Sequence, residues 1–419
     1  MAVTKKNIKQ RIGAATAILL GQDAVAQDGE LYNNWDVDLG YLRYEEPDKI
    51  EVDTYMAMIN GDLSPTDSIK LGLVFDTLTG ATPSGALPSN GGGGSTFTGV
   101  SGGQTSSGGG DTGLVEFDDT RLAFDATWTH EWHRLIRSNT SAYVSVEGDY
   151  TAVGGSLGIE KDTQDRAYTF TAAVGLATDK VGRSDETTPE PLSRTADAIF
   201  NGTGNKNTYD ALLGITHVIN KRTLAMLNYT YSTALGYHTD PYKIISVADI
   251  NDNQLANGTL YESRPDERTR QILYTKLVHE LPSTGNHFAI SYRYHTDTWD
   301  LNSHTIESHY SKRLSNNHLI EPFWRIYHQQ AANFYQRTII YDPNTQSNLS
   351  EVELPEHVSS DSRLAELLSN TIGIKYRYKT SASGSIDLRA AYIYRDYSNT
   401  IVSDEGNYFV TLSFGKGFE

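Results

Sequence analysis

Apolar and polar residues alternate with a period of two along much of the chain. In the segment SIKLGLVFDTL, for example, Leu71, Leu73 and Phe75 share one face, whereas Lys70 and Asp76 lie on the other. Successive side chains of a β-strand point to opposite faces, so this pattern predicts strands with one apolar and one mostly polar side. The same alternation recurs at residues 35–41, 141–150, 371–379 and 385–395.

The length of these runs indicates where the apolar face lies. Several are as long as the roughly 9–11 residues that a tilted strand needs to cross a bilayer, whereas the strands of soluble sandwiches are usually shorter. We therefore expect the apolar faces to contact lipid and the charged faces to line a lumen. The predicted fold class is all-β, an antiparallel up-and-down transmembrane β-barrel.

The connections between the runs fall into two groups. Short polar turns occur at residues 62–67, 133–139, 162–165, 219–222, 282–286, 314–317 and 381–384, and long segments occur at residues 79–117, 178–206, 237–266 and 333–367. Short periplasmic turns and long extracellular loops are typical of outer-membrane barrels. Placing both ends of the mature chain in the periplasm requires residues 155–161 to form a strand as well. The prediction is then a barrel of about 16 strands in the bacterial outer membrane.

The two ends of the chain resemble export and assembly signals. Residues 1–26 resemble a signal peptide, with basic residues before a short apolar stretch and the small-residue sequence AVA near the cleavage site. Residues 27–419 are then the barrel, with residues 79–117 as its Gly-rich extracellular loop. The amphipathic last strand, with Phe418 next to the end, resembles the signal that the barrel assembly machinery reads.

Composition narrows the expected partners and cofactors. With 35 basic and 52 acidic side chains the chain carries a formal charge of −17, which argues against nucleic acid as a partner. An acidic surface either holds divalent cations among anionic lipids or simply keeps the protein soluble. The absence of cysteine argues against disulfides, thiolate metal sites, a lipoprotein anchor and covalently attached haem, so no cofactor is expected. The expected partners are outer-membrane lipid, lipopolysaccharide and the assembly machinery.

The segment HEWH resembles part of a zinc-protease signature. That signature requires two histidines four residues apart on a helix, whereas His130 and His133 on a strand point to opposite faces. We expect them at the periplasmic rim, beside Trp128 and Trp132 of an aromatic girdle. No Ser-His-acid set converges on the predicted strands, so an outer-membrane hydrolase is not favoured and the chain is not expected to be an enzyme.

Charged side chains on the predicted inner face separate by sign. Those of the first half are mostly acidic: Asp36, Asp38, Glu51, Asp53, Asp76, Asp125, Glu147 and Asp149. Those of the last strands are mostly basic: Lys276, Arg293, Arg325, Lys375, Arg377, Lys379, Arg389 and Arg395. Opposite walls of unlike charge would produce a transverse field, as in porin constrictions. The alternative is that the two sets neutralise each other across a filled lumen.

Two Asp-x-Arg pairs, Asp119/Arg121 and Asp361/Arg363, each follow a long loop where a strand is expected to begin. A spacing of two residues places both charges on one face, here the lumen near its outer mouth. The pairs either line a constriction that sorts solutes by charge or form structural ion pairs that fix the loops.

Residues 291–314 contain three histidines, of which His295 and His309 are predicted to face the lumen. The hairpin places these two several residue pairs apart, which favours separate polar contacts over a shared metal site. The expected contact residues are Arg293, Glu307, Glu321 and Arg325. Trp299, between the two strands, is expected near the outer membrane interface. The candidates for the lumen or its constriction are Asp119, Arg121, Arg293, His295, Glu307, His309, Arg325, Asp361, Arg363, Lys375, Arg377 and Arg389.

Four segments resemble the signature blocks of a poorly characterised family of Gram-negative outer-membrane proteins, a domain of unknown function. They are YRYHTDTWDLNSHT (292–305), FWRIYHQQAANFY (323–335), GYHTDPYK (236–243) and FDTLTGATPSG (75–85). His238 and the Gly-rich insertion after residue 85 depart from the family pattern. The resemblance implies an outer-membrane β-barrel without a settled activity.

The resemblance also implies a class of partner. Family members often sit beside genes for a flavin transferase, a thioredoxin-like protein and a small lipoprotein, which suggests an extracytoplasmic redox system. Our leading hypothesis is a porin-like channel or scaffold that passes or positions small solutes. The alternative is an outer-membrane anchor of a larger, flavin-linked redox assembly, with a filled lumen and partner-binding loops.

Overall fold

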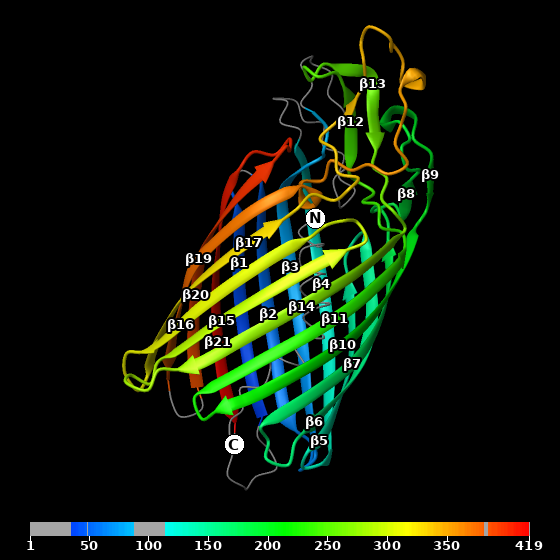
Figure 1. Cartoon of the computed structure of the whole chain (residues 1–419). Helices are drawn as coiled ribbons and strands as arrows, with labels where there is room; N and C mark the ends of the chain where they lie inside the picture. Colours follow the sequence, from blue (N-terminus) through cyan, green and yellow to red (C-terminus); the bar gives the residue numbers. More distant parts are fainter. Residues whose placement is uncertain (1–34, 48, 88–113, 381–383, 419) are drawn as a thin grey trace.

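Sixteen antiparallel strands form a closed barrel in the computed structural model (Figure 1), which describes residues 35–47, 49–87, 114–380 and 384–418. Each barrel strand pairs with the next one along the chain, and the first pairs with the last, with Leu39 opposite Phe414. The predicted fold class and strand number are confirmed. The predicted signal peptide lies outside the described residues.

The barrel strands are 11 to 20 residues long, so most of them extend beyond the hydrocarbon core of a bilayer. They are β1 (Trp35–Glu46), β2 (Ile50–Asp62), β3 (Asp67–Pro83), β4 (Leu114–His133), β5 (Ile136–Val146), β6 (Tyr150–Asp162), β7 (Tyr168–Val181), β10 (Gly204–Asn220), β11 (Thr223–Gly236), β14 (Glu267–Glu280), β15 (His287–Asp297), β16 (Ser303–Arg313), β17 (His318–Gln329), β19 (Glu366–Lys379), β20 (Gly384–Ser398) and β21 (Glu405–Phe418). Residues 155–161 lie within β6, as the placement of the chain ends required.

Side chains alternate between an exposed apolar outer face and a covered inner face. On β3, Leu73 and Phe75 are 46% and 41% exposed, whereas the neighbouring Asp76 is fully buried. A closed sheet pairs its backbone groups internally, and an apolar exterior is what lipid requires. No helix in the described part of the chain is long and apolar enough to cross a membrane.

Short turns join the strands at one end of the barrel. Between β2 and β3, Ser64 Oγ donates to Asp67 Oδ2 over 2.5 Å. The turn after β4 is shorter than predicted, because pairing already begins with Ile136 opposite His133. His130 lies near this end between Trp128 and Trp132, with ring centroids 5.6 and 4.6 Å away, as the aromatic-girdle interpretation expected.

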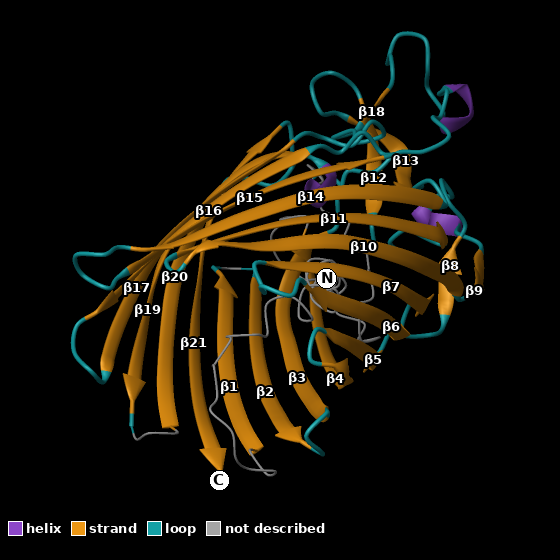
Figure 2. Cartoon of the chain, turned by 60° about the horizontal axis from the view of Figure 1, so that its bottom comes forward, coloured by secondary structure: helices purple, strands orange, loops and turns teal. Residues whose placement is uncertain are grey.

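Three long connections fold together at the other end of the barrel (Figures 1 and 2). We call residues 182–203, 237–266 and 330–365 the cap. Its elements are β8 (Thr187–Pro189), η1 (Thr195–Asp197), β9 (Phe200–Gly202), β12 (Ile244–Ala248), β13 (Gln254–Tyr261), β18 (Ile339–Ile340), η2 (Leu349–Glu351) and η3 (Ser362–Leu364). β12, β13 and β18 form a three-stranded sheet over a small core of Ile245, Val247, Leu255, Leu260, Ile339, Val352 and Val358. The long connections are therefore largely ordered and not simple loops.

The segment predicted as the Gly-rich loop, residues 79–117, is partly structured. Its ends belong to β3 and β4, and its residues 88–113 lie outside the described part of the chain. Between them, Leu87 N–H donates to Ser246 Oγ over 3.0 Å. Gly85 has a φ of +97°, and a Cβ there would come within 2.4 Å of the Ile244 carbonyl oxygen. The cap therefore contacts the start of this segment. The prediction that residues 79–117 form a loop throughout is wrong.

Trp299 does not lie at the lipid interface, contrary to the prediction. It is 3% exposed and packs in a small cluster with Leu301, Ala332, Phe334 and Leu364. Its indole N–H donates to the Glu267 carbonyl oxygen over 2.9 Å, and the Arg268 guanidinium lies 4.2 Å from the ring centroid. The long connection after β17 folds back over this position, which the alternation of a single strand does not reveal.

Candidate functional site: the lumen and its outer mouth

The predicted luminal histidines of β15 and β16 have separate partners. His309 Nε2 lies 2.6 Å from Glu307 Oε1, and its Nδ1 lies 3.2 Å from Glu321 Oε1 on β17. His295 sits elsewhere, with Nε2 4.0 Å from Asp297 Oδ2. In the β15–β16 register, His295 pairs with Ser303 and His309 with Ala289. The two histidines therefore have separate neighbours: His309 contacts the expected Glu307 and Glu321, whereas His295 lies beside Asp297, which was not among the expected contacts.

His295 lines a hollow in the inner wall that spans seven neighbouring strands. Its lining includes small inward-facing residues such as Ala173 and Gly175, and Asp210 and Arg270 add charge. The Nδ1 atom of His295 is buried and has no hydrogen-bond partner among the described residues.

Two basic residues of β19 share one carboxylate on β20. Lys375 Nζ lies 3.2 Å from Asp387 Oδ2, and Arg377 donates from Nε to Asp387 Oδ1 over 2.7 Å. The cross-strand register places Arg377 directly opposite Asp387. The charges of Lys375 and Arg377, both predicted to face the lumen, are therefore partly neutralised by a carboxylate on the neighbouring strand.

Of three other luminal arginines, two lie over aromatic rings and the third lies beside a carboxylate. Arg389 lies 4.2 Å from the Phe323 ring centroid and 5.4 Å from that of Phe409, and Arg293 lies 5.8 Å from that of Tyr274. Arg325 is the one of the three that forms an ion pair with a carboxylate among the described residues: its Nε lies 3.9 Å from Glu307 Oε2. An aromatic face orients a guanidinium without neutralising its charge. We call Arg293, Arg325 and Arg389 the luminal arginines.

The acidic wall is smaller than predicted. Asp38 and Asp125 face the lumen, but Glu51 and Asp53 face outward, on the same side of β2 as the exposed Tyr55. Both contact Arg43 on the outer surface, at 2.8 and 3.2 Å. The apolar residues at this end of β2 point inward instead, where Ile50 and Val52 pack with Leu78 and with Tyr242 of the cap. The cap makes the inside of the mouth apolar and reverses the usual pattern there.

The second Asp-x-Arg pair does not begin a strand, contrary to the prediction. Asp361 is the N-cap of η3, and Arg363 donates from Nε to both its carboxylate oxygens, over 2.8 and 2.7 Å. Arg363 also reaches Asp240 at 3.0 Å, while Arg264 bridges Asp361 at 2.9 Å and Glu262 at 2.6 Å. Although burial alone would raise it, the cations Arg363, Lys243 and Arg264 hold the pKa of Asp361 well below its usual range. This network joins two of the long connections, which supports the structural alternative for this pair.

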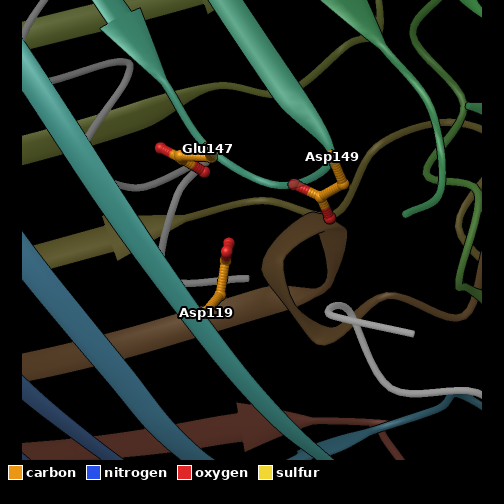
Figure 3. Close-up of side chains that lie close together, drawn as sticks. All are labelled: Asp119, Glu147 and Asp149. Carbon is orange, nitrogen blue, oxygen red and sulfur yellow. The ribbon is translucent and has the colours of Figure 1, made fainter. Parts of the chain in front are cut away.

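The first Asp-x-Arg pair lies on β4 and faces the lumen at its outer mouth. Arg121 is 3% exposed and donates from Nε to Asp76 Oδ2 over 2.6 Å. Asp119 Oδ1 accepts the Thr120 backbone N–H over 2.8 Å and lies beside Glu147 and Asp149 of the β5–β6 connection (Figure 3). Both residues are too buried to line an open constriction.

Glu147 and Asp149 were not among the candidate site residues, although the sequence placed both on the inner face. Burial raises the pKa of Glu147 to about 8, against the attraction of Arg121. Burial and the nearby Asp119 raise the pKa of Asp149 to about 7. The sequence offered one signal for this site, which is two acidic residues two positions apart at the end of a strand. The proximity of Asp119 to them is visible only in the folded structure.

A closed barrel with an apolar exterior and a charged lumen defines an outer-membrane β-barrel protein. The chain belongs to the family described as protein of unknown function (DUF3570), which matches residues 9–413. No curated protein matches the sequence.

Solved structures with a similar shape are outer-membrane proteins. A bacterial polysaccharide outer membrane secretin is 9% identical, with a TM-score of 0.47 and coverage of 93% of this chain and 100% of that one. The CymD monoaromatic hydrocarbon channel is 9% identical, with a TM-score of 0.40 and coverage of 93% and 90%. A BenF-like porin from Pseudomonas fluorescens Pf-5 is 7% identical, with a TM-score of 0.41 and coverage of 92% and 98%. Similarities this low do not bear on what this barrel transports or binds.

Proposed function

We propose that the protein is a porin-like channel for small polar solutes that favours anions. The observation that carries the proposal is the placement of Arg293 over Tyr274 and of Arg389 over Phe323 and Phe409. A guanidinium paired with a carboxylate offers little to a passing anion, whereas one placed on an aromatic ring keeps both its charge and its donors. In a lumen with low-dielectric walls, such groups raise the local anion concentration.

The distribution of the remaining charges supports the same function. Asp125 lies on β4, which is seven strands away from β17 in the ring of sixteen and therefore nearly opposite Arg325, whereas Asp38 on β1 is only two strands from β20, which carries Arg389. Unlike charges on opposite walls orient a polar solute as it passes, as rings and walls of charged side chains do in other pores. The ordered cap at the outer end then restricts which solutes reach the lumen.

The test is the reversal potential of the purified full-length barrel in planar bilayers under a gradient of potassium chloride. We expect stepwise conductance with a chloride preference, and the double variant Arg293→Gln, Arg389→Gln should shift the reversal potential toward potassium. Arg43→Gln is the matched control, because Arg43 lies on the outer surface. A barrel that never conducts would exclude a channel, and an unchanged reversal potential in the double variant would exclude the selectivity mechanism.

A second candidate function is an anchor for an extracytoplasmic partner, such as a small lipoprotein or a redox protein. The observation that favours it is the cap, which has its own core and ion-pair network and therefore presents an ordered surface outside the barrel. Cross-linking in native membranes from cysteines introduced at exposed cap positions, for example Glu190→Cys, should recover one defined partner. Recovery of the barrel alone from every such position would count against the anchor.

A further inference from the structure

Asp119, Glu147 and Asp149 place three carboxylate groups together at the outer mouth of the barrel (Figure 3). Asp119 lies on β4, the other two lie on the β5–β6 connection, and one oxygen of each lies within 4.8 Å of the others. The backbone N–H of Gly148 donates to Asp119 Oδ1 over 3.4 Å, so strand and connection are in direct contact. Ionised carboxylates at this separation repel each other unless a cation lies between them.

Glu147 is an independent indication that a ligand belongs here. The residue is 7% exposed, and neither of its carboxylate oxygens has a hydrogen-bond partner among the described residues. Arg121 Nε lies 3.8 Å from Glu147 Oε1, but the same nitrogen donates to Asp76 over 2.6 Å. A buried carboxylate without hydrogen bonds is strongly destabilising, and buried charges are normally paired or coordinate a metal.

We propose that Asp119, Glu147 and Asp149 bind a calcium ion that links β4 to the β5–β6 connection. Calcium prefers six to eight oxygen ligands at about 2.3–2.6 Å, so two ligands on opposite sides of the ion are separated by roughly 4.6–5.2 Å. Oxygens that all lie within 4.8 Å of one another are close enough to share one such ion. Magnesium usually keeps several waters and binds through only one or two carboxylates, so a set of three carboxylates favours calcium. Water would supply the remaining ligands.

The ion would stabilise the rim of the barrel beneath the cap. The backbone N–H of Gly182, where the cap begins, donates to the Asp149 carbonyl oxygen over 3.0 Å. The β5–β6 connection therefore contacts β4 on one side and the cap on the other. A bound cation would remove the repulsion among the three carboxylates and so strengthen the contacts of the connection with β4 and with the cap.

The experiment is a calorimetric titration of calcium chloride into the purified full-length barrel in uncharged detergent, free of lipopolysaccharide and treated with EDTA. We expect one saturable site per chain with a dissociation constant of roughly 0.1–1 mM, the range of extracellular calcium sites. Glu147→Gln and Asp149→Asn should both lose it. Glu190→Gln is the matched control, because Glu190 is an exposed acidic residue of the cap.

Glu147→Gln removes only a charge, so the barrel should still fold, which heat-modifiable electrophoretic mobility verifies. Asp149 is less buried than Glu147, so Asp149→Asn provides a second test of the same site. The absence of a saturable site in the unmodified protein, or equal binding in both variants, would overturn the proposal. Magnesium that displaces calcium at equal or lower concentration would overturn the assignment to calcium.

Discussion

At the scale of single residues, His238 shows how the cap alters a side chain that departs from the family pattern. Its Nδ1 lies 2.6 Å from the Gly236 carbonyl oxygen, and its ring meets the Trp299 ring edge-on at 5.6 Å. Burial and the nearby Lys206 lower its pKa to about 3, and Arg268 and Arg270 act in the same direction. The folded protein therefore keeps this imidazole neutral at pH values at which the unfolded chain is protonated.

Acidification should loosen the cap around His238. A histidine whose pKa is lower in the folded state stabilises the fold above the ordinary pKa of 6.5, and this stability is lost as the pH falls from 6.5 toward 3. At pH 5 the loss is about 2 kcal/mol. Hydrogen exchange of residues 237–243 at pH 7 and pH 5 measures it. His238→Asn can still donate to Gly236 but does not titrate, and an equal pH dependence in that variant would contradict the prediction.

At the scale of elements, the cap depends on buried ion pairs between its segments. Arg264 joins Glu262, which precedes β14, to Asp361 of η3, and the three side chains are 7%, 0% and 2% exposed. Arg337 and Asp252 form another pair in the cap, but their side chains are 31% and 45% exposed. Removing one partner of a buried pair leaves an uncompensated charge, whereas an exposed pair contributes little.

Arg264→Met should therefore detach the cap segments while the barrel remains closed. We expect a loss of about 3–5 kcal/mol in the stability of the cap, against less than about 1 kcal/mol for the matched control Arg337→Met. Limited proteolysis within residues 330–365 reports on the cap, and heat-modifiable mobility reports on the barrel. Equal cleavage of the two variants would show that the network does not hold the cap.

At the scale of the whole molecule, the two faces of the barrel have different solvents. On β21, Leu412 is 48% exposed on the outer face, whereas Ser413 lies inside between Gly40 and Asp387. A charge on the outer face has to enter lipid, but a charge on the inner face meets a polar lumen.

Leu412→Arg should destabilise the folded barrel in lipid vesicles by about 2–4 kcal/mol, because position 412 lies near the middle of β21. Ser413→Arg, one residue away, should change stability much less, since Asp387 is its cross-strand neighbour. Equilibrium unfolding of both variants by denaturant in the same vesicles makes the comparison. Similar losses for the two positions would contradict the assignment of faces.

The sequence by itself determined the barrel, its strand number and the faces of most luminal residues. Period-two alternation is a local property of a strand, and connection lengths fix which strands are neighbours, so both can be read without a structure. Arg293, Glu307 and His309 were placed correctly for this reason. The alternation predicted the wrong face for Glu51 and Asp53, because the cap fills the mouth and makes the inner face apolar there.

Only the tertiary structure decided which inward residues meet. Arg389 rests on Phe323 and Phe409 from other strands, and Asp119 lies beside Glu147 and Asp149. These contacts depend on the stagger between strands and on the packing of the cap, and neither is encoded in the alternation of any one strand. The long connections gave no periodic signal, because their order comes from a shared core and from ion pairs such as that of Arg264 with Asp361.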